Sequence, residues 1–398
     1  MPDTAQFDPR FDTIIDRRGS ACEKWDEMES VMGVSATDGL AMWVADTDFR
    51  PPQVVQDTVE HLVRTGVYGY AGDQNPQRDA TIWWMATRHG WTVTRDDILI
   101  THGLVNGLGH LVDALTAPGD AVVLFTPVYH AFAAIITASQ RVVVECPMVL
   151  DDGRYVLDFD AYDAQMTGAE KMLVLSSPHN PGGRVWSPEE LRAIADFCTR
   201  HDLILASDEI HHDLVYPGHR HHVLATVAPD IQDRLVTMTS ASKTFNIAGG
   251  KVGNLIITDP ALRKRVRDRL KPFGMSRNLF GMAMSEAAYS PEGAAWVDDL
   301  MGYLDRNRKL FDAGIEAIPG VRSIRLEATF LSWIDFSATG MSQSEIASRI
   351  RDDARIAANA GPSFGSGGDR FMRFNIGLPR ARIEEAVSRL QDAFRDLQ

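Results

Sequence analysis

Short apolar segments rich in β-branched residues recur through the middle of the chain, separated by amphipathic stretches. Such segments are typical of strands that are buried on both faces of a sheet. They lie at residues 121–125, 141–146, 171–175, 203–206, 234–239 and 252–258. Because helical patterns lie between several of them, we expect right-handed βαβ units. The predicted fold is α/β, with a mostly parallel central sheet flanked by helices.

The clearest helix signal begins at Ser187. Ser187 suits the N-cap position, Pro188 the first helical position, and Glu190 the third, which together form a capping box. Apolar residues then recur at helical spacing from Leu191 to Cys198. This pattern predicts a helix that begins at residue 188.

The pattern changes after Ser290 and Pro291. A long amphipathic stretch predicts a helix that ends before Pro319 and Gly320. Strand-like segments at 321–326, 330–336 and 371–376, a helix at 342–354 and a final helix from Arg382 complete a smaller α+β region. We therefore expect an N-terminal segment at 1–49 that packs with the small domain, a large domain at 50–290 and a small C-terminal domain at 291–398.

Composition and charge exclude several classes of protein. The 398 residues are 44% hydrophobic and 24% charged, which is typical of a globular chain with more than one core. The net charge of −14 disfavours nucleic acid as a partner. Three dispersed cysteines indicate neither a disulfide framework nor a cysteine-based zinc site, and they favour the cytoplasm. No export signal or membrane span of roughly 18 apolar residues is expected.

Lys243 and Asp208 each follow a predicted buried strand. Lys243 lies in the sequence S-A-S-K-T-F-N at 240–246, an unusual place for a solvated charge, and it could form a Schiff base. Asp208 lies about 35 residues upstream in A-S-D-E-I-H and could pair with a pyridinium nitrogen. Ligands bind at the carboxyl ends of strands in open parallel sheets. A surface lysine and a helix-capping aspartate are the structural alternatives.

Two further strand ends carry groups that suit a flat heterocycle. Asn180 lies in the turn S-S-P-H-N-P-G-G and could donate to a phenolate oxygen. Tyr129 lies in T-P-V-Y and could place its ring against the heterocycle, although simple packing is the alternative.

Two segments suit anionic groups. The turn at 101–107 follows an apolar strand and could hold a phosphate on backbone amides. Ser240, Ser242 and Lys251 could add hydroxyls and a cation to that site. Arg373 lies within an apolar strand, where a guanidinium needs an anion, either a substrate carboxylate or a structural salt-bridge partner.

Taken in order, these motifs resemble those of the fold-type I enzymes that use pyridoxal 5'-phosphate (PLP), the aminotransferase superfamily, over nearly the whole chain. The resemblance implies that Lys243 holds PLP, Asp208 contacts its ring nitrogen and Asn180 its phenolate oxygen. It also implies that Arg373 binds the substrate carboxylate. The further implied contacts are Tyr129 and His211 on the cofactor, Gly103, Leu104 and Val105 on the phosphate, and Asn180 and Ala45 on the substrate.

Within the superfamily, the chain is most similar to the MalY/PatB-type cystathionine β-lyases, or carbon-sulfur lyases. The segments that carry this resemblance are residues 42–49, 68–70, 126–129, 207–211 and 242–249. The resemblance implies cleavage of L-cystathionine or a related cysteine S-conjugate to a thiol, pyruvate and ammonia, with Lys243, Asp208 and Tyr129 as catalytic residues. It also implies a homodimer with the active site at the interface, where Tyr68 reaches the neighbouring phosphate.

Other functions use some of the same residues. An aminotransferase shares the core motifs and differs in needing a keto acid acceptor, and a racemase is a minor alternative. Five histidines, at positions 211, 212, 219, 221 and 222, could suggest a metal centre. The sequence has no H-E-x-x-H motif, and we expect no metal. A non-catalytic binding protein has no support in the motifs.

Overall fold

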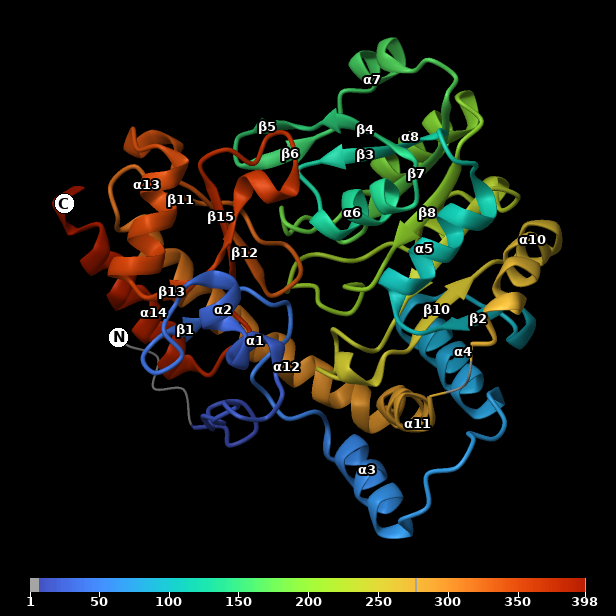
Figure 1. Ribbon diagram of the computed structural model, residues 1–398, viewed down its shortest axis with the longest axis horizontal. Helices are drawn as coiled ribbons and strands as arrows, with labels where there is room; N and C mark the ends of the chain where they lie inside the picture. Colours follow the sequence, from blue (N-terminus) through green and yellow to red (C-terminus); the bar gives the residue numbers. More distant parts are fainter. Residues whose placement is uncertain (1–6, 276–277, 398) are drawn as a thin grey trace.

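The computed structural model describes residues 7–275 and 278–397, and its largest feature is a seven-stranded sheet (Figure 1). The strand order is β2-β10-β9-β8-β7-β3-β4. Neighbouring strands are parallel except at β10, which is antiparallel to both β2 and β9. The strands are β2 (Ile98–Thr101), β3 (Ala121–Thr126), β4 (Val142–Pro147), β7 (Glu170–Ser176), β8 (Ile204–Asp208), β9 (Leu235–Thr239) and β10 (Gly253–Ile256).

Alternate residues of these strands face two helical layers. Val122 and Leu124 of β3 belong to a cluster with α5, α6 and α10, whereas Val123 and Phe125 belong to a cluster with α8. The inner strands of the sheet are therefore buried on both faces, which explains why they are mainly apolar, whereas the edge strand β4 is only partly buried. The helices around the sheet are α3 (Gln53–Thr65), α4 (Asn75–His89), α5 (Leu104–Leu115), α6 (His130–Ala138), α7 (Phe159–Gln165), α8 (Pro188–Arg200), α9 (Leu224–Val227), α10 (Pro260–Leu270) and α11 (Leu279–Ala288). A small hairpin joins β5 (Val149–Asp151) to β6 (Arg154–Val156).

The C-terminal part builds a four-stranded antiparallel sheet in the order β11-β12-β15-β14. Its strands are β11 (Arg322–Ser323), β12 (Leu331–Asp335), β14 (Asn359–Ala360) and β15 (Phe371–Asn375), and its helices are α12 (Pro291–Glu316), α13 (Gln343–Ser348) and α14 (Arg380–Ala393). The N-terminal elements α1 (Glu23–Asp26), α2 (Met28–Met32) and β1 (Leu40–Ala41) lie beside this part (Figure 1). There, β1 pairs in parallel with β13 (Ile356–Ala357).

The predicted α/β class and its second, smaller domain are confirmed, and the capping box at Ser187 begins α8 as expected. The strand predicted at 252–258 is β10, which runs antiparallel to its neighbours in the mostly parallel sheet, and the helix predicted at 342–354 is α13 followed by a π-helical turn at Arg349–Asp353. One local prediction needs correction, because the strand predicted at 321–326 is only two residues long. The domain boundaries at 49/50 and 290/291 stay a prediction. No helix in the described ranges is both long and apolar enough to cross a membrane.

Candidate active site

A cavity lies where β7, β8 and β9 end. The strand register aligns Ser176 with Asp208 and Asp208 with Met238, so the segments after these strands leave the sheet at one edge. The cavity brings together most of the residues predicted for the site: Ala45, Gly103, Leu104, Val105, Tyr129, Asn180, Asp208, His211, Ser242, Lys243 and Lys251. Its lining also includes His102, which belongs to the predicted turn at 101–107, and four residues that were not predicted for the site: Phe132, Ser176, Ile210 and Ala248.

Lys243 presents its amine to this cavity. Its Nζ donates to the carbonyl oxygen of Ala45 at 2.7 Å. Burial lowers the pKa of Lys243 to about 8, although the nearby carboxylate of Asp46 favours the charged form. An amine with this pKa is partly neutral near pH 7, as a base or nucleophile requires.

Asp208 is the acidic group at the base of the cavity. It accepts a hydrogen bond from the backbone N–H of Ile210 at 3.2 Å, and burial raises its pKa to about 7. A cationic N–H group beside this carboxyl would restore the ionised form, because opposite charge offsets the cost of desolvation. The side chain therefore suits a protonated heterocyclic nitrogen. His211 also lines the cavity, and its Nδ1 is buried without a hydrogen-bond partner.

The turn before α5 offers an anion site. Gly103 has a φ of +89°, a left-handed conformation that favours glycine, and α5 begins at the next residue. The first amides of a helix have no intrahelical partners and attract anions. A Cβ on Gly253 would lie 2.7–2.9 Å from atoms of Thr101, Gly103 and Leu104, so only glycine lets β10 pack against this turn.

Ser242 and Lys251 line the cavity, whereas Ser240 does not. The Ser240 hydroxyl donates to the carbonyl of Val252 at 2.6 Å and lies 2.6 Å from the Ser242 hydroxyl. Ser240 therefore orients Ser242 in this structure.

Arg373 does not itself line the cavity, but it contacts Asn180, which does, and it is buried, with 2% of its surface exposed. Its guanidinium donates to Asn180 Oδ1 at 3.0 Å, Asn359 Oδ1 at 2.8 Å and the carbonyl of Trp43 at 3.0 Å. All three acceptors are neutral, and no carboxylate in the described ranges forms an ion pair with it. The structural salt-bridge interpretation is therefore wrong. Burial lowers its pKa to about 10, so the group stays charged and suited to a carboxylate ligand.

Residues 43–49 form a strap over Lys243. Asn246 donates to the carbonyls of Thr47 and Phe49, both at 2.8 Å, and accepts from the N–H of Thr47. Asn375 donates to two other carbonyls of the strap, those of residues 44 and 46. Neither asparagine was predicted for this role. Asn375 could have been, because its polar amide lies within the same apolar strand as Arg373.

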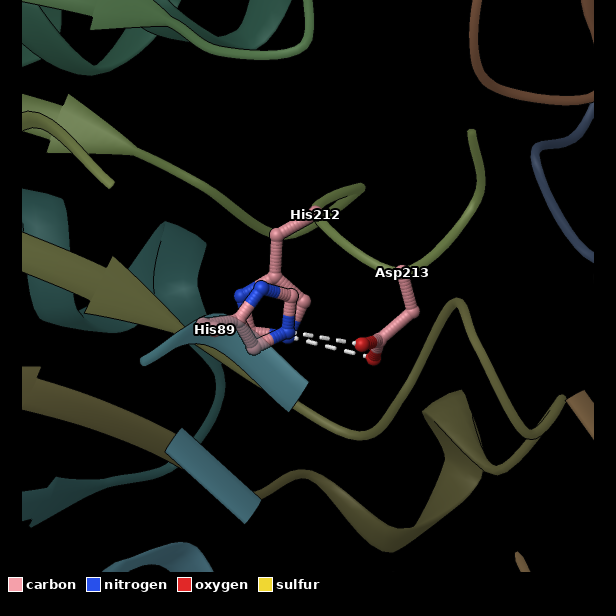
Figure 2. Close-up of side chains that lie close together, drawn as sticks. All are labelled: His89, His212 and Asp213. Carbon is pink, nitrogen blue, oxygen red and sulfur yellow. Dashed lines mark hydrogen bonds and ion pairs between the residues drawn. The ribbon is translucent and has the colours of Figure 1, made fainter. Parts of the chain in front are cut away.

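The five histidines do not form one centre. His211 lines the cavity, His221 lies 2.9 Å from Glu209, and His219 and His222 are half-buried outside it. His212 instead lies in a cluster with His89 and Asp213 (Figure 2).

The two tyrosines predicted for the site differ in position. Tyr129 immediately precedes α6 and lines the cavity, and burial raises the pKa of its hydroxyl. Tyr68 does not line the cavity of this chain. It is 56% exposed and packs on Phe280, with 5.5 Å between ring centroids. Val67 and Tyr70 beside it are also exposed, at 75% and 101%.

Comparison with known proteins identifies the family. Residues 47–390 match the family described as aminotransferase class I and II. Cystathionine beta-lyase PatB of Bacillus subtilis is 36% identical over 386 residues, which cover 96% of this chain and 99% of that protein. Protein MalY of Escherichia coli is 29% identical over 97% of this chain and 98% of its own length.

A crystal structure of cystalysin from Treponema denticola, which contains a pyridoxal 5'-phosphate cofactor, superimposes with a TM-score of 0.92. It is 34% identical and covers 98% of this chain and 99% of its own. The family resemblance predicted from the motifs is confirmed. The chain belongs to the class I and II aminotransferase family and has the fold-type I architecture.

Proposed function

We propose that this protein is a PLP-dependent carbon-sulfur β-lyase. Its substrate is L-cystathionine or a related cysteine S-conjugate, and its products are a thiol, pyruvate and ammonia. The observation that carries the proposal is the placement of Lys243 and Asp208 in one cavity, with pKa values shifted toward each other to about 8 and about 7. Such pairs are typical of acid-base sites. The relatives named as cystathionine β-lyases support the choice of reaction.

The donor set of the cavity fits PLP. In this proposal Lys243 binds the cofactor, Asp208 holds the ring nitrogen, and Asn180 faces the phenolate oxygen. Tyr129 and His211 contact the ring. The groups assigned to the phosphate are Gly103, Leu104, Val105, Ser242 and Lys251, with Ser240 acting through Ser242. When bound, PLP supplies the electron sink that a carbanion at the substrate Cα requires.

The chain's own residues perform the remaining tasks. Arg373 binds the α-carboxylate and Asn180 and Ala45 border it, which fixes the substrate orientation. Lys243 Nζ would be the base that removes the proton from the substrate Cα. Asp208 keeps the ring nitrogen protonated. Departure of the thiolate from Cβ would leave aminoacrylate, which one water molecule hydrolyses to pyruvate and ammonia.

We also propose that the protein forms a homodimer and that it lies in the cytoplasm. The exposed Val67, Tyr68 and Tyr70 form an apolar loop surface that a second copy of the chain would cover. In that arrangement, Tyr68 contacts the phosphate of the neighbouring subunit. Three unpaired cysteines support a reducing compartment.

The test is a visible absorbance spectrum of the purified protein before and after addition of L-cystathionine, with pyruvate measured in the same sample. We expect a cofactor band, a change on addition, and pyruvate without any keto acid. A band with turnover only after a keto acid is added would identify an aminotransferase. No band after incubation with PLP would refute the proposal.

Lys243→Ala should remove both the band and turnover, since the amine holds the cofactor and moves the proton. Lys264→Ala is the matched control, because Lys264 lies on the exposed face of α10 and pairs with Asp268. Normal turnover in Lys243→Ala would contradict the assignment of this residue.

A further inference from the structure

Asp213 is a fully buried carboxylate outside the cavity, and several donors surround it. Its Oδ1 accepts from Trp84 Nε1 at 3.0 Å and lies 2.8 Å from His89 Nε2. Its Oδ2 accepts from the Thr244 hydroxyl at 2.9 Å and lies 3.2 Å from His212 Nε2. In Figure 2 the two imidazole rings lie against each other and point toward this carboxylate, and their centroids are 4.2 Å apart.

These contacts indicate that Asp213 is a structural anion and not a metal ligand. A carboxylate has about four lone-pair sites. Here an indole N–H and a hydroxyl occupy two of them, and the two imidazoles face the others. His212 above all, and then His89, hold the pKa of Asp213 well below its ordinary value despite burial. The group is therefore ionised and held by four residues from three segments of the chain: helix α4, the segment after β8 and the segment after β9.

Two of these partners lie next to residues of the cavity whose relative positions matter for the proposed reaction. Thr244 directly follows Lys243, and His212 directly follows His211. The β8–β9 ladder fixes Asp208 opposite Met238, but beyond these strands both segments leave the sheet. The Asp213–Thr244 hydrogen bond joins them again. Trp84 and His89 lie on α4, so they attach this junction to a helix of 15 residues.

We propose that Asp213 is a positioning residue that sets, through Thr244, where the Lys243 amine stands relative to the cofactor ring held by Asp208. This inference rests on the proposed function. Asp213 does not line the cavity, and the pKa of Lys243 depends mainly on burial and then on the charges of Asp46, Arg373 and Asp208. Asp213 therefore acts through geometry.

Thr244→Val tests the link with the smallest change, because it removes one hydroxyl from a buried site and keeps the shape of the side chain. We expect kcat to fall on the order of 10- to 100-fold, since small misplacement of a reacting group has effects of this size. KM should change little, because Arg373 and Asn180 still hold the carboxylate. Thr244→Ser keeps the hydroxyl and should restore wild-type behaviour.

The decisive measurement needs no substrate. The visible band of the bound cofactor is titrated with pH, and its midpoint reports the environment of the lysine nitrogen. We expect Thr244→Val and Asp213→Asn to shift this midpoint and Thr244→Ser to leave it in place. Glu170→Gln is the matched control, since it changes a buried carboxylate that binds Thr167 and Gly168 at the opposite end of β7.

The control should lose thermal stability without moving the midpoint. A Thr244→Val protein with wild-type midpoint and kcat would overturn the inference, even if Asp213→Asn fails to fold. If wild type has the cofactor band but releases no pyruvate, the proposed lyase function fails, and the midpoint still decides the role of Asp213.

Discussion

Replacing Arg373 with glutamine tests how the site recognises its substrate. The wild-type guanidinium is buried among three neutral acceptors, so its charge remains available to an incoming carboxylate. Glutamine keeps a donor for Asn180 but carries no charge and cannot form the two parallel bonds of an arginine fork.

The expected magnitude follows from the bonds that are lost. A hydrogen bond to a charged group contributes about 1.5–3 kcal/mol, so a two-bond fork contributes about 3–6 kcal/mol. Since about 1.4 kcal/mol corresponds to a factor of ten, kcat/KM should fall by about 10²- to 10⁴-fold. The cofactor band should persist, because Arg373 is assigned to the substrate.

The assay compares L-cystathionine with the corresponding amine that lacks the α-carboxylate. Wild type should strongly prefer the carboxylate, and Arg373→Gln should lose that preference. Arg141→Gln is the matched control. Arg141 is also buried, but it precedes β4 at the edge remote from the cavity and donates to Thr116 and Ser139. Equal preference in wild type and Arg373→Gln would refute the role of this guanidinium.

Three further changes have defined outcomes. In cofactor-free protein, the raised pKa of Asp208 means that protonation stabilises the fold below about pH 4 and that this contribution is lost as the pH rises to about 7. Thermal unfolding of Asp208→Asn should lack this component, and an unchanged pH profile would contradict it. Asn375→Ala removes three hydrogen bonds to backbone groups and should cost about 3 kcal/mol in chemical denaturation; a loss below about 1 kcal/mol would argue against the strap. In the proposed homodimer, Tyr70→Asp puts a charge on the exposed loop and should give monomers in sedimentation with low turnover, whereas an unaltered dimer would contradict the proposed interface.

Local signals in the sequence were sufficient to predict most strands of the central sheet. Apolar runs predicted β3, β7, β8 and β9, because both faces of these strands are covered, and they also predicted the edge strand β4, which is only partly buried. The direction of β10 could not be predicted in this way. An antiparallel strand buried on both faces has the same composition as a parallel one, and its direction follows from its pairing with β2 and β9.

The candidate site likewise contains residues that local sequence patterns predict and residues that they do not. Lys243, Asp208 and Asn180, which all line the cavity, were predicted because each lies at or just after the end of a strand in a recognisable motif. The strap contacts of Asn246 and Asn375 join residues 197–199 and 329–331 positions apart, and no local pattern encodes them. Asp213 was missed for a related reason. Its donors Trp84 and His89 come from a helix more than 100 residues upstream, with separations of 129 and 124.

The strap also has a consequence for how the protein is made. Its carbonyl at Val44 binds Asn375, which is synthesised 331 residues later. At about 5–20 residues per second, a ribosome needs roughly 20 to 60 s to make this partner. The central sheet can form during that interval, but the strap cannot take its final position over Lys243. The site therefore matures only after the C-terminal strand β15 has left the ribosome, and nascent chains that stop before it should contain Lys243 without its cover.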